Sequence, residues 1–154
     1  MNRIIVMWLS LAGNLVFAGS WSVEGLGQQS LKSSDLKKET TVLQFWASWC
    51  GSCSEVFWDM KKIHGSNPEV DYFTINTDPN KSNIEPYLGK LSLKDYLMER
   101  TFFDSQKRLS KSMKVKTIPT VIVLNRSGEI IKRLEGHYSS AEFLAQSVLG
   151  RESP

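Results

Sequence analysis

The two cysteines of this 154-residue chain, Cys50 and Cys53, lie three positions apart in the stretch "FWASWCGSC" that begins at Phe45. Two thiols at this spacing could form a reversible disulfide, half of a metal site or a passive crosslink. A structural disulfide gains least from closing a short loop, so C-x-x-C is a poor crosslink. A structural zinc site needs four ligands, and this motif supplies two. The spacing therefore favours reversible redox chemistry.

The segments on either side of the motif predict how the two thiols differ. Residues 40–46, "TTVLQFW", are β-branched and aromatic, as in a buried strand, and residues 51–64 fit a helix. Cys50 would then lie at a helix N-terminus, where free N–H groups and the helix dipole favour a thiolate. Cys53 would lie one turn further in and be more shielded. We therefore expect Cys50 to attack a substrate disulfide and Cys53 to resolve the mixed disulfide.

The rest of the chain alternates strand and helix patterns before a β-hairpin. The predicted helix face consists of Val56, Phe57, Met60 and Ile63, and the helix should end within residues 65–68. The further predicted elements are a strand at 70–76, a turn at 78–80, a helix at 82–97, an extended piece at 102–104, a short helix at 106–113, strands at 120–124 and 130–134 around a turn at 125–128, and a helix at 139–149. This order predicts an α/β fold whose sheet contains parallel and antiparallel strands.

Composition and charge describe one globular domain without a nucleic-acid interface. The apolar and charged fractions are ordinary, and the chain is long enough for a hydrophobic core. The net charge of +3 is spread along the sequence rather than gathered in a long basic run. We therefore expect no nucleic-acid partner.

The N-terminal segment has the pattern of an export signal. Arg3 precedes an apolar run from Ile4 to Ala12, no acid occurs in it, and "VFA" ends at Ala18 before Gly19. The apolar run is too short to span a bilayer comfortably. We interpret residues 1–18 as a signal peptide, or as an uncleaved membrane anchor, and residues 19–154 as one domain. The location should be periplasmic or otherwise exported, where a pair of thiols tends to oxidise to a disulfide.

Two segments resemble the signatures of the thioredoxin superfamily. "FWASWCGSC" is similar to its active-site form F-W-A-x-W-C-G-x-C, and residues 117–137, "TIPTVIVLNRSGEIIKRLEGH", are similar to its cis-proline segment. The N-terminus and residues 30–47, "SLKSSDLKKETTVLQFWA", resemble the TlpA/ResA branch of exported thiol:disulfide oxidoreductases. The resemblance implies a thioredoxin fold for residues 19–154, with a mixed central β-sheet flanked by helices on both faces. It also implies no dissociable cofactor and no bound metal.

The resemblance assigns roles around the two cysteines. Cys50 matches the nucleophile and Cys53 the resolving thiol, while Trp49 matches the tryptophan beside the site. Gly51 and Ser52 form the dipeptide that influences the redox potential, and many relatives have proline as its second residue. The potential of this pair is therefore left open by the sequence.

Three further positions match residues that shape the family's site. Trp46 matches an aromatic packed beneath it, and Pro119 matches the cis-proline that packs against the disulfide. Ile118, just before it, would present its backbone N–H and C=O to an extended substrate segment.

Two departures from the family pattern concern proton transfer. Thioredoxins place a buried aspartate where this chain has Gln44, which cannot ionise. TlpA/ResA-like proteins commonly place a glutamate six residues after the first cysteine, where this chain has Val56. Glu55 is one residue earlier and about 100° around the helix, so we assign it no acid–base role. The sequence does not identify the group that transfers protons to and from the cysteines.

The resulting prediction is an exported thiol:disulfide oxidoreductase, acting through Cys50 and Cys53 as a reductase of exported protein disulfides of the cytochrome c maturation type. Its partners would be protein thiol or disulfide substrates and a membrane electron donor or acceptor, with anchoring through the N-terminus left open. One alternative is a disulfide-forming oxidant, whose Cys50 thiolate would be unusually stabilised. Another is a copper-binding carrier using His137, although such carriers usually have C-x-x-x-C.

Overall fold

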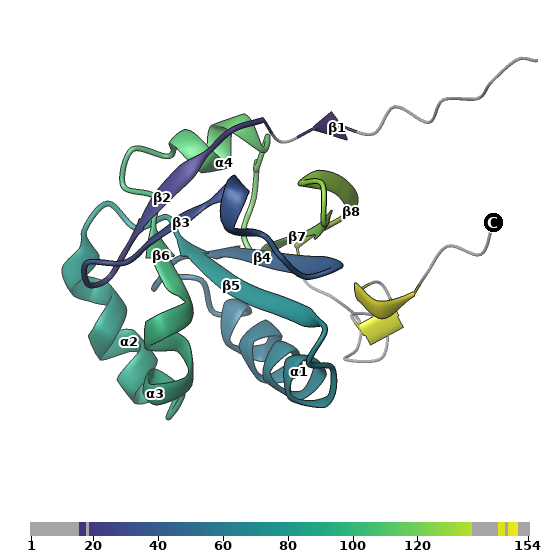
Figure 1. The fold of residues 1–154 in the computed structure, drawn as a ribbon. Helices are drawn as coiled ribbons and strands as arrows, with labels where there is room; N and C mark the ends of the chain where they lie inside the picture. The colour runs from purple at the N-terminus through teal and green to yellow at the C-terminus, as the bar shows by residue number, and fades with distance from the viewer. Residues whose placement is uncertain (1–15, 18, 137–144, 147, 151–154) are drawn as a thin grey trace, which may run out of the picture.

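Strand β4, Thr40–Trp46, lies in the middle of the sheet, and every one of its residues except Thr40 is buried. A computed structural model describes residues 16–17, 19–136, 145–146 and 148–150 (Figure 1). β4 pairs in parallel with β5, Val70–Asn76, and antiparallel with β7, Thr120–Asn125. The sheet has eight strands in the order β1-β8-β7-β4-β5-β6-β2-β3. The predicted mixed sheet is thus confirmed.

The remaining strands extend the sheet on both sides of this centre. They are β1 Val16–Phe17, β2 Ser22–Gly25, β3 Ser30–Lys32, β6 Thr101–Phe103 and β8 Glu129–Glu135. The antiparallel pair β2–β3, which joins the edge of β6, was not predicted from the sequence. Its strands are four and three residues long, too short to give a clear alternating pattern.

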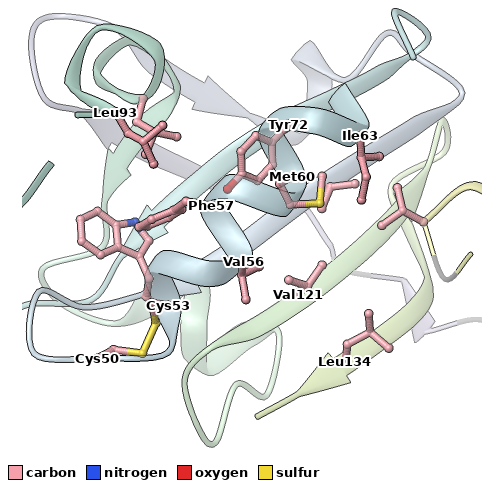
Figure 2. Packing of buried hydrophobic residues seen from close by; sticks show 14 of the residues in the cluster. Cys50, Cys53, Val56, Phe57, Met60, Ile63, Tyr72, Leu93, Val121 and Leu134 are labelled. Atoms are coloured by element: carbon pink, nitrogen blue, oxygen red, sulfur yellow. A yellow bond between two sulfur atoms is a disulfide. The ribbon is translucent and has the colours of Figure 1, made fainter. Parts of the chain in front are cut away.

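Helices cover both faces of the sheet, as the thioredoxin fold requires (Figure 1). Helices α1 Cys53–Ser66, α2 Ile84–Lys90 and α3 Lys94–Leu97 lie on one face, and α4 Arg108–Ser112 lies on the other. The predicted apolar face of α1 is confirmed, since its four apolar side chains are buried against the sheet (Figure 2). The short 3-10 helices are Ser33–Asp35, Lys81–Asn83 and Met98–Arg100.

Helix α1 begins and ends two residues later than predicted. Its start moves to Cys53 because residues 50–52 form a turn in which the Cys53 N–H donates to the Cys50 carbonyl. Its end moves because Asn67, and not Gly65, caps the helix: the Asn67 side chain donates to the Ile63 carbonyl at 2.7 Å. Cys50 therefore lies three residues before the first residue of the helix, further from it than predicted.

The predicted helix over residues 82–97 is wrong as a single element. The chain breaks between α2 and α3 at Ser92, which has a left-handed φ of 54°. This break allows Leu93 and Leu97 to be buried in the same apolar cluster as Leu88. Burial on both sides of the break therefore outweighs a continuous helical pattern.

The predicted short helix over residues 106–113 is confirmed in position but is shorter. Lys107 has a left-handed φ of 53°, so α4 begins only at Arg108. The buried Asp104 carboxylate accepts the N–H groups of Leu109 and Ser110, which would otherwise lack partners in the first turn. A capping carboxylate thus sets where this helix starts.

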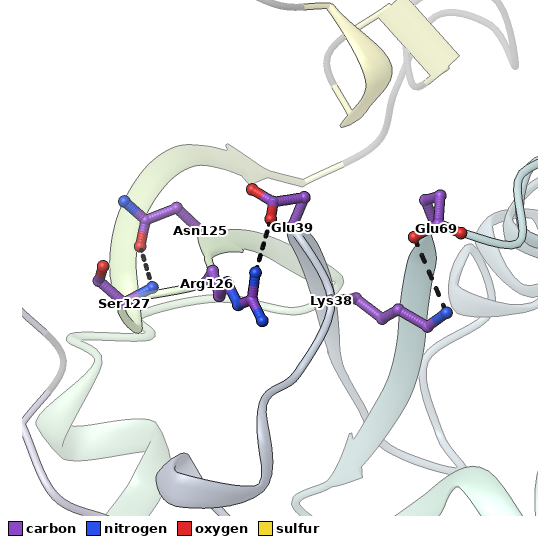
Figure 3. A network of polar contacts seen from close by, with 6 residues as sticks. All are labelled: Lys38, Glu39, Glu69, Asn125, Arg126 and Ser127. Carbon is purple, nitrogen blue, oxygen red and sulfur yellow. Dashed lines mark hydrogen bonds and ion pairs between the residues drawn. The ribbon is translucent and has the colours of Figure 1, made fainter.

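The hairpin turn between β7 and β8 lies where the sequence predicts it. The Asn125 side-chain oxygen accepts the N–H of Ser127 at 3.0 Å, and Gly128 has a left-handed φ of 77° (Figure 3). Arg126 forms an exposed ion pair with Glu39 at the start of β4 (Figure 3). These contacts lie at the end of β4 far from Cys50.

Two predictions concern the chain ends. Residues 1–15, 18 and 137–144 lie outside the described residues, so most of the predicted export signal and most of the helix at 139–149 stay predictions. Val16–Phe17, within the predicted signal, pairs antiparallel with Ile130 and Glu129 of β8. Among the residues that are described, no helix has the length and apolar character needed to cross a membrane.

Candidate active site

Cys50 and Cys53 form a disulfide between the end of β4 and the start of α1 (Figure 2). Their Cα atoms are 5.5 Å apart. Cys50 is 6% exposed and Cys53 is fully buried, so of the two cysteines only Cys50 has any contact with solvent. The asymmetry expected from the sequence is present in the structure.

The backbone of Cys50 is held from two sides. Its N–H donates to the Ala47 carbonyl at 3.0 Å, and its carbonyl accepts the Tyr87 hydroxyl of α2 at 3.4 Å. Burial, followed by the charge of Asp78, raises the pKa of Tyr87, so its hydroxyl stays protonated and can donate. Tyr87 also stacks on the buried Trp46 ring with centroids 5.4 Å apart. Trp46 therefore packs beneath the site, as the sequence predicts.

Gln44 connects the resolving cysteine to the core. Its side-chain N–H donates to the Cys53 carbonyl at 3.2 Å, and its side-chain oxygen accepts the Tyr72 hydroxyl at 2.5 Å. All three residues are buried. Burial raises the pKa of Tyr72 well above its usual range, so Tyr72 is a neutral donor. The position at which thioredoxins carry an acid thus serves here to bind the start of α1 to β5.

Asp78 is a residue of the site that the sequence reasoning missed. It lies two residues after the end of β5, is 1% exposed, and accepts the N–H of Ser48 at 2.9 Å. It also accepts the Ser48 hydroxyl and the side-chain amide of Asn76. Because β4 and β5 are parallel, their carboxyl ends lie side by side, and this placement could have been inferred from the predicted strands. Asp78 fixes the loop that carries Trp49 and Cys50.

A groove of about 280 Å³ opens at Trp49, the residue before Cys50. Trp49, 72% exposed, and Ile118, half-buried, both line it. The Ile118–Pro119 peptide bond is cis, as the resemblance implies. The groove therefore brings together two residues predicted from distant parts of the sequence. Contact between the Ile118 backbone and a substrate stays a prediction.

Gly51 and Ser52 lie in the turn between the two cysteines, as the sequence requires. The Ser52 hydroxyl is 4.0 Å from Cys50 Sγ, at the long limit of a hydrogen bond to sulfur. Gly51 has open space where a Cβ would be, so its backbone carries no close contact that demands glycine. Their effect on the redox potential is untested.

The two histidines of the chain, His64 and His137, are the remaining candidates for metal ligands. His64 Nδ1 is 3.0 Å from the Tyr96 hydroxyl, and burial, followed by the charge of Arg100, lowers the pKa of His64. His137, the ligand of the copper alternative, lies outside the described residues. The described residues contain no group of three or more His, Cys, Asp or Glu side chains suited to a metal ion.

Comparison with known proteins identifies the family. The thioredoxin-like domain family matches residues 27–147, and the chain therefore belongs to this family. Sporulation thiol-disulfide oxidoreductase A of Bacillus subtilis is 30% identical over 103 residues, covering 62% of this chain and 59% of that protein. Thiol-disulfide oxidoreductase ResA of Bacillus subtilis is 23% identical over 136 residues, covering 80% of this chain and 74% of that protein.

Solved structures show the same fold. A Chlorobium tepidum protein assigned as a thiol:disulfide interchange protein DsbE superposes with a TM-score of 0.77 at 23% identity, covering 88% of this chain and 94% of that one. StoA from Bacillus subtilis superposes with a TM-score of 0.66 at 25% identity, covering 84% of this chain and 96% of that one. The chain spans only 59% of the length of the sporulation oxidoreductase.

Proposed function

We propose that this chain is an exported thiol:disulfide oxidoreductase that reduces disulfides of other exported proteins. The observation that carries the proposal is the unequal exposure of the pair, with Cys50 slightly exposed next to the groove residue Trp49 and Cys53 fully buried. Only Cys50 can meet a substrate sulfur, and only Cys53 is held where it can displace that substrate afterwards. The names of both Bacillus subtilis relatives support thiol–disulfide chemistry.

The reaction begins with both cysteines reduced. The Cys50 thiolate attacks one sulfur of a substrate disulfide, forms a mixed disulfide, and releases the other substrate sulfur as a thiolate that takes up a proton. Cys53 loses its proton and attacks Cys50 Sγ, which restores the intramolecular disulfide and releases the second substrate thiol. Two electrons and two protons pass from the cysteine pair to the substrate. Gln44, which cannot ionise, is not the acceptor of the Cys53 proton.

The surroundings of Cys50 support a reductant rather than an oxidant. A strong oxidant needs a reduced form that is stabilised, which means a well-stabilised thiolate. In the described part of the chain, the Ser52 hydroxyl approaches Cys50 Sγ only to 4.0 Å, and α1 begins three residues later. Both effects stabilise the thiolate weakly. A reductant in an oxidising compartment needs electrons from a membrane donor, so we include such a donor among the partners.

Export is supported by the sequence and by two structural neighbours. Residues 1–18 have the signal pattern described above. The neighbours are described as a secreted Mycobacterium tuberculosis disulfide oxidoreductase and an exposed lipoprotein thioredoxin of Streptococcus pneumoniae. Mass spectrometry of the protein recovered from its own cells tests this point. A mature N-terminus at Gly19 would support a cleaved signal, and an intact Met1 on soluble intracellular protein would contradict export.

Reduction of insulin by the full chain, with dithiothreitol as electron donor, tests the activity. We expect the wild-type protein to accelerate insulin precipitation, Cys50→Ser to be inactive, and Cys53→Ser to trap mixed disulfides visible on a non-reducing gel. The two variants are matched, because each replaces one sulfur of the same disulfide with oxygen. Full activity of Cys50→Ser would contradict the assigned roles.

A further inference from the structure

The groove beside Cys50 carries positive charge that the disulfide chemistry does not use. Besides Trp49 and Ile118, its lining includes the lysines Lys107 and Lys116, and none of the described residues that line it carries a carboxylate. Both lysines are exposed. An extended substrate segment that passes Ile118 to reach Cys50 must therefore lie within reach of two ammonium groups.

The surrounding sequence strengthens this charge. Residues 105–128 contain no Asp or Glu. The part of this stretch before β7 contains five cations, which are Lys107, Arg108, Lys111, Lys114 and Lys116. In the described part of the chain, neither groove lysine takes part in an ion pair. Two of these cations, Lys107 and Lys116, line the groove, although the whole chain is only mildly basic.

Among the described residues, Asp104 and Glu135 are acids near these lysines, and both already have partners. The buried Asp104 carboxylate accepts two backbone N–H groups and the Ser110 hydroxyl. Glu135, which lines the neighbouring depression with Lys116, lies 3.7 Å from Arg133. Asp104 weakens the positive field from beneath, but neither acid forms an ion pair with a groove lysine.

The backbone that carries the lysines is well held. The Lys107 N–H donates to the Asp104 carbonyl at 2.9 Å, and the Lys107 carbonyl accepts the Lys111 N–H at 3.0 Å. After α4, the Val115 N–H donates to the Ser110 carbonyl at 2.8 Å, one residue before Lys116. Because α4 is anchored at both ends, the lysines project from fixed points on the groove wall.

We infer that this groove selects substrate proteins whose reactive disulfide is flanked by acidic residues, with Lys107 and Lys116 as the residues that determine this specificity. The inference rests on the proposed function. Carboxylates beside the substrate cysteine would pair with the two ammonium groups, while apolar atoms of the segment pack on the Trp49 ring. An exposed ion pair changes a rate or equilibrium constant by about 1.4- to 5-fold, so two independent pairs multiply to about 2- to 25-fold. We expect a preference of about three- to tenfold, in the middle of that range.

Two synthetic peptides of equal length test this specificity. Each has one cysteine, joined by a disulfide to 2-thiopyridine, and the cysteine is flanked by glutamates in one peptide and glutamines in the other. The reduced full chain is mixed with each peptide. Cys50 attacks the peptide sulfur and releases 2-thiopyridone, and Cys53 then displaces the peptide thiol, so the protein dithiol is oxidised as the probe is reduced. Release of thiopyridone gives the second-order rate constant.

The variant Lys107→Gln/Lys116→Gln removes both groove charges, and Lys62→Gln/Lys90→Gln removes two exposed charges elsewhere as a matched control. We expect the glutamate peptide to react about three- to tenfold faster with the wild type and with the control. The preference should fall to about one in the groove variant, and also in about 0.5 M salt, which screens exposed charges.

The possible outcomes distinguish a failure of this inference from a failure of the proposed function on which it rests. Equal rates for both peptides with wild-type protein would overturn the acidic preference and leave the oxidoreductase intact. A preference that persists in the groove variant would overturn the assignment to these lysines. Failure of both peptides to react would overturn the proposed function itself.

Discussion

The hydrogen bonds of Gln44 give the most direct test of how the site is joined to the core. Gln44 lies on β4, accepts the Tyr72 hydroxyl of β5, and donates to the Cys53 carbonyl of α1. We consider Gln44→Met, which keeps the approximate length and volume of the side chain, and Tyr72→Phe, which removes only the hydroxyl. Each change removes one partner of the same buried hydrogen bond.

The expected cost follows from what each change leaves behind. In Gln44→Met, the buried Tyr72 hydroxyl has lost its acceptor, which costs about 1–3 kcal/mol of unfolding free energy. In Tyr72→Phe, the buried Gln44 oxygen has lost its donor, at a similar cost of about 1–3 kcal/mol. In the double variant both the Tyr72 hydroxyl and the Gln44 oxygen are absent, so neither buried group is left without its partner. Its destabilisation should therefore be about 1–2 kcal/mol smaller than the sum of the two single changes.

Urea unfolding of the oxidised protein measures these free energies, with midpoints compared at a constant slope. Tyr96→Phe is the matched control, because its hydroxyl contacts His64 instead of Gln44. Combined with Gln44→Met, it should show additive effects within about 0.5 kcal/mol. Additive costs for the Gln44 and Tyr72 changes would refute the reasoning, since the shared hydrogen bond would then contribute nothing.

Two further predictions concern Asp78 and His64. Asp78→Ala should lower the unfolding free energy by about 3 kcal/mol and slow disulfide exchange, because the Ser48 N–H and the Asn76 amide lose a charged acceptor. Asp78→Asn should restore part of the stability and part of the exchange rate. An Asp78→Ala variant whose unfolding free energy is within about 0.5 kcal/mol of wild type would contradict this role. Because the folded state lowers the pKa of His64 below the unfolded value of 6.5, that residue's contribution to stability should be complete above pH 6.5 and be lost as pH falls through the lower folded value. His64→Gln should flatten this dependence in urea titrations between about pH 5.5 and 7, and an unchanged slope would contradict it.

The parts of the fold predicted correctly are those with strong local patterns. The bounds of β4 and β5 follow from uninterrupted β-branched and aromatic runs, and the β7–β8 hairpin from the turn at Asn125–Gly128. The break at Ser92 could not be predicted in this way. It depends on burial of Leu93 and Leu97 against residues distant in the chain, which the local helical pattern does not contain.

The residues of the site also divide into those with a local motif and those whose role depends on contacts between distant parts of the chain. The cysteine pair and the cis peptide bond at Pro119 were expected from two short motifs. Asp78 was missed because its role depends on the parallel pairing of β4 with β5, which places it against Ser48, 30 residues away. The position of the groove lysines could likewise not be predicted, because a mildly basic sequence does not show which charged side chains lie near Cys50.

The reduction potential of the Cys50–Cys53 pair tests the central claim most directly. Equilibration of the full chain with dithiothreitol buffers, followed by tryptophan fluorescence, should report it, since Trp46 and Trp49 lie just before the pair in the sequence and Trp46 packs beneath it. We predict a reversible two-electron couple near the thioredoxin value of about −270 mV. A value near about −120 mV would contradict the reductase assignment, and the absence of a reversible couple would contradict dithiol chemistry altogether.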